Sequence, residues 1–211
     1  WSVGTGAVHI GSNAGMISQG NEAVAIGTNA GRSNQGTHSI AIGANAGGTN
    51  QGTYGVAIGF NAGSSYQNKH SVALGYYSGA NNQNQYSVAI GSEAGKFQQN
   101  ASSVSIGTKA GYDHQNTNSV AIGYGALKSN VSGCNNVAIG CAALYCTNTG
   151  SNSVAIGYGA GDDGQKYHAI AIGADSGAIS QGWDAVAIGR SAGNENQGSQ
   201  AVAIGHRAGL Y

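Results

Sequence analysis

Short apolar runs of one kind recur along the whole chain. The phrase Val-Ala-Ile-Gly, or a close variant of it, occurs thirteen times in the 211 residues. The spacing between repeats is 16 residues, except at the two steps from Gly123 to Gly140 and from Gly140 to Gly157, where it is 17. The glycines that end the runs are Gly11, Gly27, Gly43, Gly59, Gly75, Gly91, Gly107, Gly123, Gly140, Gly157, Gly173, Gly189 and Gly205.

Each run has the alternation of a β-strand. The residue before the glycine is isoleucine in twelve repeats and Leu74 in one, and two positions earlier there is always valine or isoleucine. Alanine lies between them in eleven repeats, with His9 and Ser105 as the exceptions. Bulky β-branched residues therefore lie on one face and small residues on the other. The pattern predicts strands at 24–26, 40–42 and their equivalents, with under a tenth helix.

Turn-forming residues recur between these strands. A second glycine follows the first by four residues in eleven repeats, and Leu127 and Leu144 replace it in the other two. Nine residues after the first glycine, most repeats carry glycine or asparagine, which tolerate a positive φ. We interpret this position as a left-handed turn. It is occupied by Gly20, Gly36, Gly52, Asn68, Asn84, Asn100, Asn116, Gly182 and Gly198, with Lys166 as an exception.

A unit with one strand and two turn signals is typical of one coil of a β-solenoid. We predict an all-β, parallel β-solenoid of about 13 coils of 16–17 residues, forming a single repeat domain over residues 1–211. Coils would stack about 4.8 Å apart by parallel strand pairing. Like residues would then form columns in which side-chain amides bond from coil to coil. The glutamine column is Gln19, Gln35, Gln51, Gln67, Gln83, Gln99 and Gln115, and an asparagine column is Asn13, Asn29, Asn45 and Asn61.

The repeats resemble the head repeats of trimeric autotransporter adhesins of the YadA type. The stretch GYGALKSNVSGCNNVAIGCAALYCTNTGSNSVAIG, from Gly123 to Gly157, also resembles repeats in tail fibres of phages and in surface proteins of large viruses and bacteria. The resemblance implies a left-handed β-roll with three chains side by side, and an extracellular adhesive role at a cell or virion surface. Because the chain begins at Trp1 and ends at Tyr211 within a repeat, we expect a fragment of a longer protein.

The two faces of the strand also favour a homotrimer. A solvent-exposed strand face normally carries polar residues, and neither face does so here. In one interpretation the bulky face fills the coil and the alanines pack near a threefold axis. In the alternative the alanines fill a narrow coil and the Val/Ile face meets the partner. The candidate interface residues of the first interpretation are Ala25, Ala41, Ala57, Ala73, Ala89, Ala121, Ala138, Ala155, Ala171, Ala187 and Ala203.

Composition excludes several classes of protein. Charged residues make up 8% of the chain, and eight basic side chains balance eight acidic ones. A nucleic-acid partner would require a basic surface, and a membrane-surface helix would require clustered lysine and arginine. No apolar run is long enough to insert into a membrane. The three cysteines, Cys134, Cys141 and Cys146, are too few for a disulfide scaffold, and both inter-chain cross-links and free thiols stay open.

Aromatic side chains are the main candidates for recognition. The residue before successive strand runs is Glu22, and then His38, Tyr54, His70 and Tyr86. We call His38, Tyr54, His70 and Tyr86 the aromatic strip. It is a candidate surface for a host glycan or protein, and the competing interpretation is ring stacking that only stiffens the turn. Phe60 and Tyr76 form a second adjacent pair.

Catalytic chemistry has little support. A glycan-degrading tailspike, the first alternative function, needs two facing carboxylates, for which Asp163 and Asp175, next to Asp162, are the nearest candidates. An ice- or crystal-binding solenoid, the second alternative, would require a regular threonine array. The sequence contains no metal-ligand spacing of histidines and no cofactor motif. We therefore expect no enzyme activity and no cofactor. The two longer repeats predict an interrupted coil outline between Leu127 and Cys146.

Overall fold

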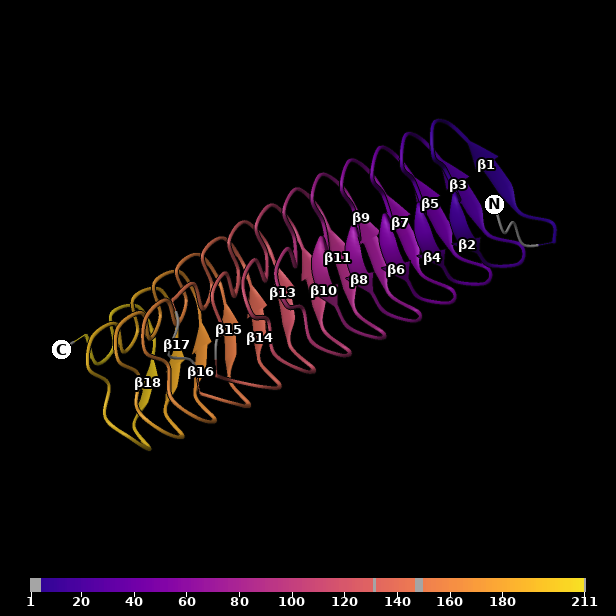
Figure 1. Ribbon diagram of the computed structural model, residues 1–211. Helices are drawn as coiled ribbons and strands as arrows, with labels where there is room; N and C mark the ends of the chain where they lie inside the picture. The colour runs from indigo at the N-terminus through magenta and orange to yellow at the C-terminus, as the bar shows by residue number, and fades with distance from the viewer. Residues whose placement is uncertain (1–4, 131, 147–149, 211) are drawn as a thin grey trace. The chain divides into compact units, whose positions relative to one another are not determined.

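The computed structural model describes residues 5–130, 132–146 and 150–210 (Figure 1). Every regular element in these residues is a β-strand, and the described part of the chain contains no helix. The strands pair in parallel from coil to coil, which confirms the predicted parallel β-solenoid. The chain forms two compact units, Trp1–Ile106 and Gly107–Tyr211.

The first unit contains two parallel sheets. One sheet is built from the predicted strands β1 (Val8–Ile10), β3 (Val24–Ile26), β5 (Ile40–Ile42), β7 (Val56–Ile58), β9 (Val72–Leu74), β11 (Val88–Ile90) and β12 (Val104–Ile106). The register joins equivalent residues of successive repeats, as in the pairing of Ala57 with Ala73. The predicted strands at 24–26 and 40–42 are therefore confirmed.

The second sheet of this unit was not predicted from the sequence. It consists of β2 (Ile17–Gln19), β4 (Ser33–Gln35), β6 (Thr49–Gln51), β8 (Ser65–Gln67) and β10 (Asn81–Gln83). Most of these strands are three polar residues long, with a positive φ at the middle residue, as at Asn34 and Tyr66. They lack the apolar alternation that identifies a strand in a sequence.

The second unit repeats the first sheet in the strands β13 (Val120–Ile122), β14 (Val137–Ile139), β15 (Val154–Ile156), β16 (Ile170–Ile172), β17 (Val186–Ile188) and β18 (Val202–Ile204). Where the first unit has its second sheet, the described residues of this unit form isolated bridges. They join Asp113 to Ser129, and Ile179 to both Asp163 and Glu195.

The alanine column lies inside the coil. Ten of its eleven members are 0% exposed within a single chain, and Ala203 is 6% exposed. These side chains therefore cannot form the surface that meets another chain. The interpretation with alanines at a threefold axis is wrong on this point, and the alternative with alanines in a narrow coil is the arrangement observed. The alanines that are removed from the candidate interface by this correction are Ala25, Ala41, Ala57, Ala73, Ala89, Ala121, Ala138, Ala155, Ala171, Ala187 and Ala203.

Buried glutamines complete the coil interior. Nε2 of Gln67 lies within hydrogen-bonding distance of three acceptors, the carbonyl oxygens of Val56 (2.8 Å) and Ser71 (3.3 Å) and Oε1 of Gln83 in the next coil (3.2 Å), and its two hydrogens are shared among them. The amide thus satisfies backbone acceptors of its own coil and links it to the next. Because buried polar groups are costly unless they are bonded, this column holds the coils in register.

The second glycine of each repeat makes room for this glutamine. A Cβ atom on Gly79 would lie 2.6 Å from Oε1 of Gln83, and Gly79 has a φ of 50°. Ten repeats combine this glycine with a glutamine four residues later. The two repeats with Leu127 and Leu144 carry Val131 and Asn148 at that later position instead. Both leucines are 0% exposed in one cluster with alanines of neighbouring coils, so leucine fills the space that the amide occupies elsewhere.

Replacing Leu127 with alanine should lower the free energy of unfolding by about 2–5 kcal/mol, because the coil lacks a glutamine that could fill the cavity. Urea or thermal denaturation would measure the loss. Ile179→Ala is the matched control. Because Ile179 is 45% exposed, this variant should lower the free energy of unfolding much less. Equal losses in the two variants would contradict the proposed role of Leu127 in filling the coil.

The predicted left-handed turn at the Gly/Asn column is wrong. Gly20, Gly36 and Asn68 do not have a positive φ. A Cβ atom on Gly20 would lie 2.4 Å from the backbone nitrogen of Thr37 in the next coil, so glycine is needed here for close approach. The positive φ angles fall elsewhere, including the positions of Ser18 and Glu22.

The longer repeats keep the strands in register. Val120 pairs with Val137 and Val137 with Val154, so the 17-residue spacing does not shift the sheet. Asn130 closes a local loop, because its Nδ2 donates to the carbonyl of Gly133 (2.7 Å) and its Oδ1 accepts from the Gly133 nitrogen (3.1 Å). The predicted interruption includes residue 131 and adjoins 147–149, which lie outside the described residues.

Candidate binding surfaces

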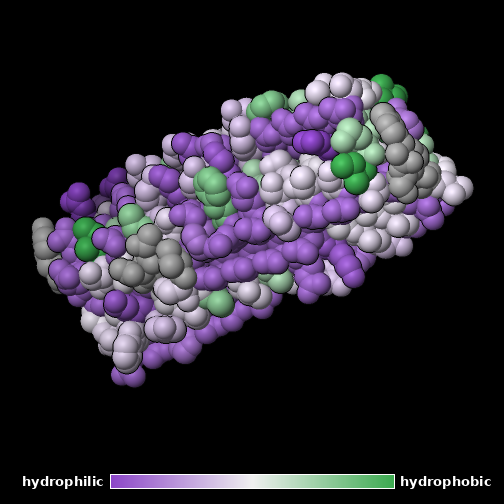
Figure 2. Space-filling view, in the orientation of Figure 1, coloured by the Kyte–Doolittle hydropathy of each residue, from purple (hydrophilic) through white to green (hydrophobic). Residues whose placement is uncertain are grey.

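The outward face of the strands is apolar in both units. Valine and isoleucine flank each buried alanine and stack on equivalent residues of the next coil. Most of these side chains are half-buried, and Leu74, Ile139, Ile156 and Ile188 are 36–41% exposed. The face of the molecule in view in Figure 2 is mostly hydrophilic with scattered apolar residues. A continuous apolar stripe is unusual on a soluble monomer and marks an interaction surface.

The aromatic strip forms a continuous stack in the first unit. The ring centroids of His38 and Tyr54, Tyr54 and His70, and His70 and Tyr86 are 5.1, 5.1 and 5.3 Å apart, with interplanar angles of 7–16°. At one end, Nδ1 of His38 lies 3.2 Å from a carboxylate oxygen of Glu22. The sequence prediction of four stacked rings is therefore correct as geometry.

Stacking determines which part of each ring can meet a ligand. Tyr54 and His70 have ring neighbours on both faces, so neither face is open to a sugar. Tyr54 and Tyr86 are nevertheless 51% and 56% exposed. The exposed parts are therefore the ring edges, which carry hydroxyl and imidazole groups that can donate and accept hydrogen bonds.

A second aromatic cluster lies in the same unit. Phe60 stacks on Tyr76 at 5.7 Å, and Tyr77 contacts both rings edge-on at 5.6 and 4.6 Å. Nζ of Lys96 lies 4.8 Å from the ring centre of Tyr77 and 2.7 Å from Glu93. The predicted pair of Phe60 and Tyr76 is thus part of a larger group whose lysine already has a carboxylate partner.

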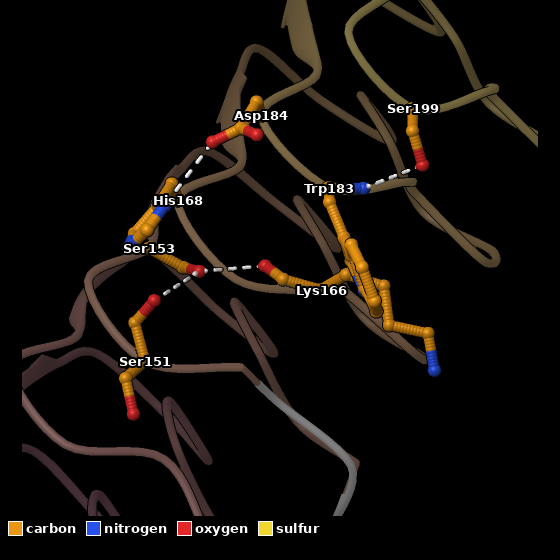
Figure 3. A network of polar contacts seen from close by, with 7 residues as sticks. All are labelled: Ser151, Ser153, Lys166, His168, Trp183, Asp184 and Ser199. Atoms are coloured by element: carbon orange, nitrogen blue, oxygen red, sulfur yellow. Dashed lines mark hydrogen bonds and ion pairs between the residues drawn. The ribbon is translucent and has the colours of Figure 1, made fainter.

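A polar network occupies one corner of the coils in the second unit (Figure 3). Nδ1 of His168 lies 3.1 Å from Oδ1 of Asp184. Oγ of Ser153 donates to the carbonyl of Lys166 (2.9 Å), and Ser199 accepts from the backbone nitrogen of Trp183 (3.2 Å). Lys166 stands out in the sequence only as the exception in the Gly/Asn column, and no repeated pattern singles out the aromatic residues Tyr167 and Trp183.

The acidic candidates of the tailspike alternative influence one another electrostatically. Burial raises the pKa of Asp162, and the charges of Asp163 and Asp175 raise it further. Burial also raises the pKa of the Cys146 thiol, with contributions from Asp162 and Asp163. The three cysteines form no disulfide bond. A catalytic role for Asp163 and Asp175 stays an untested alternative.

Asp162→Asn should stabilise the protein at pH 7, since the raised pKa means that the folded state favours the protonated form. The ionised carboxylate begins to destabilise the fold as the pH rises past the pKa of an aspartate in the unfolded chain, about 3.9. The loss of stability is complete once the pH is above the pKa of Asp162 in the folded chain. The advantage of the variant in thermal melts should therefore shrink as pH falls and disappear below the pKa in the unfolded chain. Glu195→Gln, at an exposed carboxylate, is the control. An advantage that persists at pH 3 would contradict this assignment.

The fold and its stacked columns define a β-solenoid repeat protein. A family model described as "YadA head domain repeat (2 copies)" matches the chain in several places. The matched residues are 35–46, 51–78, 67–94, 115–126 and 149–160. The chain therefore carries YadA-type head repeats, as its sequence resemblance predicted. No curated protein and no solved structure matches it significantly. None of these comparisons tests the resemblance to phage tail fibres. Within the described residues, no helix has the length and apolar character required to cross a membrane.

Proposed function

We propose that the chain is the head segment of a non-enzymatic adhesin, exposed on a cell or virion surface and assembled as a parallel homotrimer. The YadA-type head repeats support this proposal, because heads of that type form trimers and belong to surface adhesins. The observation that carries the trimer is the outward Val/Ile face. The coil interior is already filled by alanine and glutamine, so only a partner can cover this second apolar face.

Adhesion would arise from repetition. Three chains in register would present three copies of each surface column, and many weak contacts would add up to firm attachment. The aromatic strip is the first candidate for such contacts, with a host-surface glycan or protein as ligand. Because its inner ring faces are covered, it would act through hydrogen bonds from the edges of His38, Tyr54, His70 and Tyr86.

Solution mass tests the assembly. Three chains of 20.9 kDa give about 63 kDa (3 × 20.9), and native mass spectrometry or light scattering should find this species. A folded, soluble and monodisperse species of 20.9 kDa would overturn the trimer.

Asparagine substitutions test the strip. Asn118, Asn135 and Asn152 occupy the equivalent position in the second unit with φ of 56–60°, so Tyr54→Asn and Tyr86→Asn preserve a backbone that the fold tolerates. The double variant should keep its mass and thermal stability and lose attachment to host cells. Unchanged attachment would assign the strip a structural role only.

A further inference from the structure

Two exposed aromatic side chains lie one coil apart in the second unit. Tyr167 is 52% and Trp183 is 59% exposed, and the backbone nitrogen of Asp184 donates to the carbonyl of Tyr167 (3.1 Å). They occupy equivalent positions in successive repeats, where the first unit has no aromatic residue, as at Thr37, Thr53 and Lys69. In the aromatic strip, neighbouring rings cover each other's faces. Tyr167 and Trp183 do not stack on each other, so neither ring covers a face of the other.

Lys166 adds a cation, directly before Tyr167 in the sequence and on the same side as Trp183 in Figure 3. It occupies the position at which the preceding and following coils carry Gly150 and Gly182, so the equivalent residue of either neighbouring coil has no side chain. The side chain of Lys166 is exposed and forms no ion pair with the described residues. The carboxylate drawn in Figure 3, that of Asp184, has Oδ1 3.1 Å from Nδ1 of His168. Figure 3 shows that the side chains of Lys166 and Trp183 extend to the same side, away from the His168–Asp184 pair.

The backbone beneath these side chains is held firmly. The carbonyl of Lys166 accepts from Oγ of Ser153 (2.9 Å), and its nitrogen donates to the carbonyl of Gln181 (3.1 Å). The Trp183 nitrogen donates to Oγ of Ser199 (3.2 Å). Because this backbone is already ordered, little conformational entropy is lost when a ligand binds.

We propose that Lys166, Tyr167 and Trp183 form a binding site for a carboxylated sugar, such as a hexuronate or a sialic acid residue of a surface glycan. The apolar face of the pyranose ring packs on the indole or phenol ring, and the carboxylate pairs with the ammonium group of Lys166. A neutral sugar would leave the ammonium group unused, and an acidic peptide has no flat apolar face to cover the rings. This inference deepens the proposed adhesive function, because it names the ligand class of one surface site.

The test uses the full chain labelled with ¹⁵N and titrated with sodium glucuronate, sodium N-acetylneuraminate or glucose. The indole N–H signal of Trp183, assigned by its loss in Trp183→Ser, should shift with at least one of the acids. The dissociation constant should be about 1 mM, and glucose should bind about tenfold more weakly. Lys166→Gln should abolish the preference for the acid. Trp183→Ser should abolish binding of every sugar, monitored through the backbone signals of Tyr167.

Two controls separate this site from general effects. Serine is native at the equivalent Ser151 and Ser199, so Trp183→Ser should fold normally. Lys69→Gln removes an exposed lysine of the first unit, at the position equivalent to Tyr167, and should leave the titration unchanged. The proposal is overturned if neither acid shifts the signal at about 10 mM, if glucose binds equally well, or if a polyglutamate peptide binds more tightly than both acids. Solution mass is independent of this result, so failure here leaves the trimer and the strip to their own tests.

Discussion

Ala89→Arg should unfold the coils around β11. Ala89 is 0% exposed, and its register partners are Ala73 and Ser105 of the adjacent coils. The Cβ position built on Gly95 lies only 3.3 Å from the Ala89 Cβ, so the interior has no space for a guanidinium group. An unpaired buried charge together with overpacking places the loss above about 4 kcal/mol, at the upper end for single substitutions. Circular dichroism and limited proteolysis would report the loss of strand structure.

Ala89→Ser provides the matched control for that variant. Serine is native at the equivalent position in the next coil, where Oγ of Ser105 accepts a hydrogen bond from Nε2 of Gln99 (3.2 Å). Gln83 holds the same position relative to residue 89 and can supply the same bond. The serine variant should therefore melt close to the native temperature. If Ala89→Arg remained fully folded but dissociated, Ala89 would lie at an interface, contrary to its burial inside the coil.

Most of the fold could be predicted from the sequence because one strand per coil has a clear alternation. The Val-Ala-Ile runs identified β3 and β5 at their observed bounds. Stacking of the aromatic strip followed from the repeat alone, since residues 16 apart must lie on neighbouring coils. The second sheet escaped prediction because strands such as β4 carry polar residues and owe their pairing to the coil geometry.

The errors have a common physical origin, which is the width of the coil. A repeat length does not reveal how much space the coil encloses. In the described residues the interior is filled mainly by alanine, serine and glutamine amides, with leucine in place of the amide at Leu127 and Leu144 and buried asparagine at Asn130 and Asn136. The bulky face of the strand must therefore point outward. The glycine at Gly20 was likewise assigned to a turn, whereas it is required by the close approach of the next coil.

The candidate sites were predictable only where the repeat made a column. His38, Tyr54, His70 and Tyr86 recur at one position over four coils and could be found by counting. Tyr167 and Trp183 recur only twice, and their neighbour Lys166 was visible as the break in a Gly/Asn column. The sequence signal for this site is the departure of these residues from the regular repeat, because packing explains the residues that follow the repeat.

Replacing Val88 and Ile90 together with glutamate should separate the proposed trimer without unfolding the chain. Both residues flank Ala89 in β11 but are half-buried on the outward face of a single chain. In a trimer with chains in register, the double variant would bring six carboxylates together near the axis, and like charges in a dry interface are strongly unfavourable. The coil interior would be unchanged. Light scattering should therefore show a fall from about 63 kDa (3 × 20.9 kDa) to 20.9 kDa, with the strand signal in circular dichroism retained.

The same strand thus yields opposite outcomes from its two faces. A charge at Ala89 should unfold the coil, and charges at Val88 and Ile90 should disrupt only the proposed assembly. Gln85→Glu is the control for added charge, because Gln85 is exposed in the same coil and away from the apolar stripe. It should change neither mass nor stability. A Val88/Ile90 variant that stays at the native mass would mean that the chains meet through another surface, and the Val/Ile face would then require a different partner.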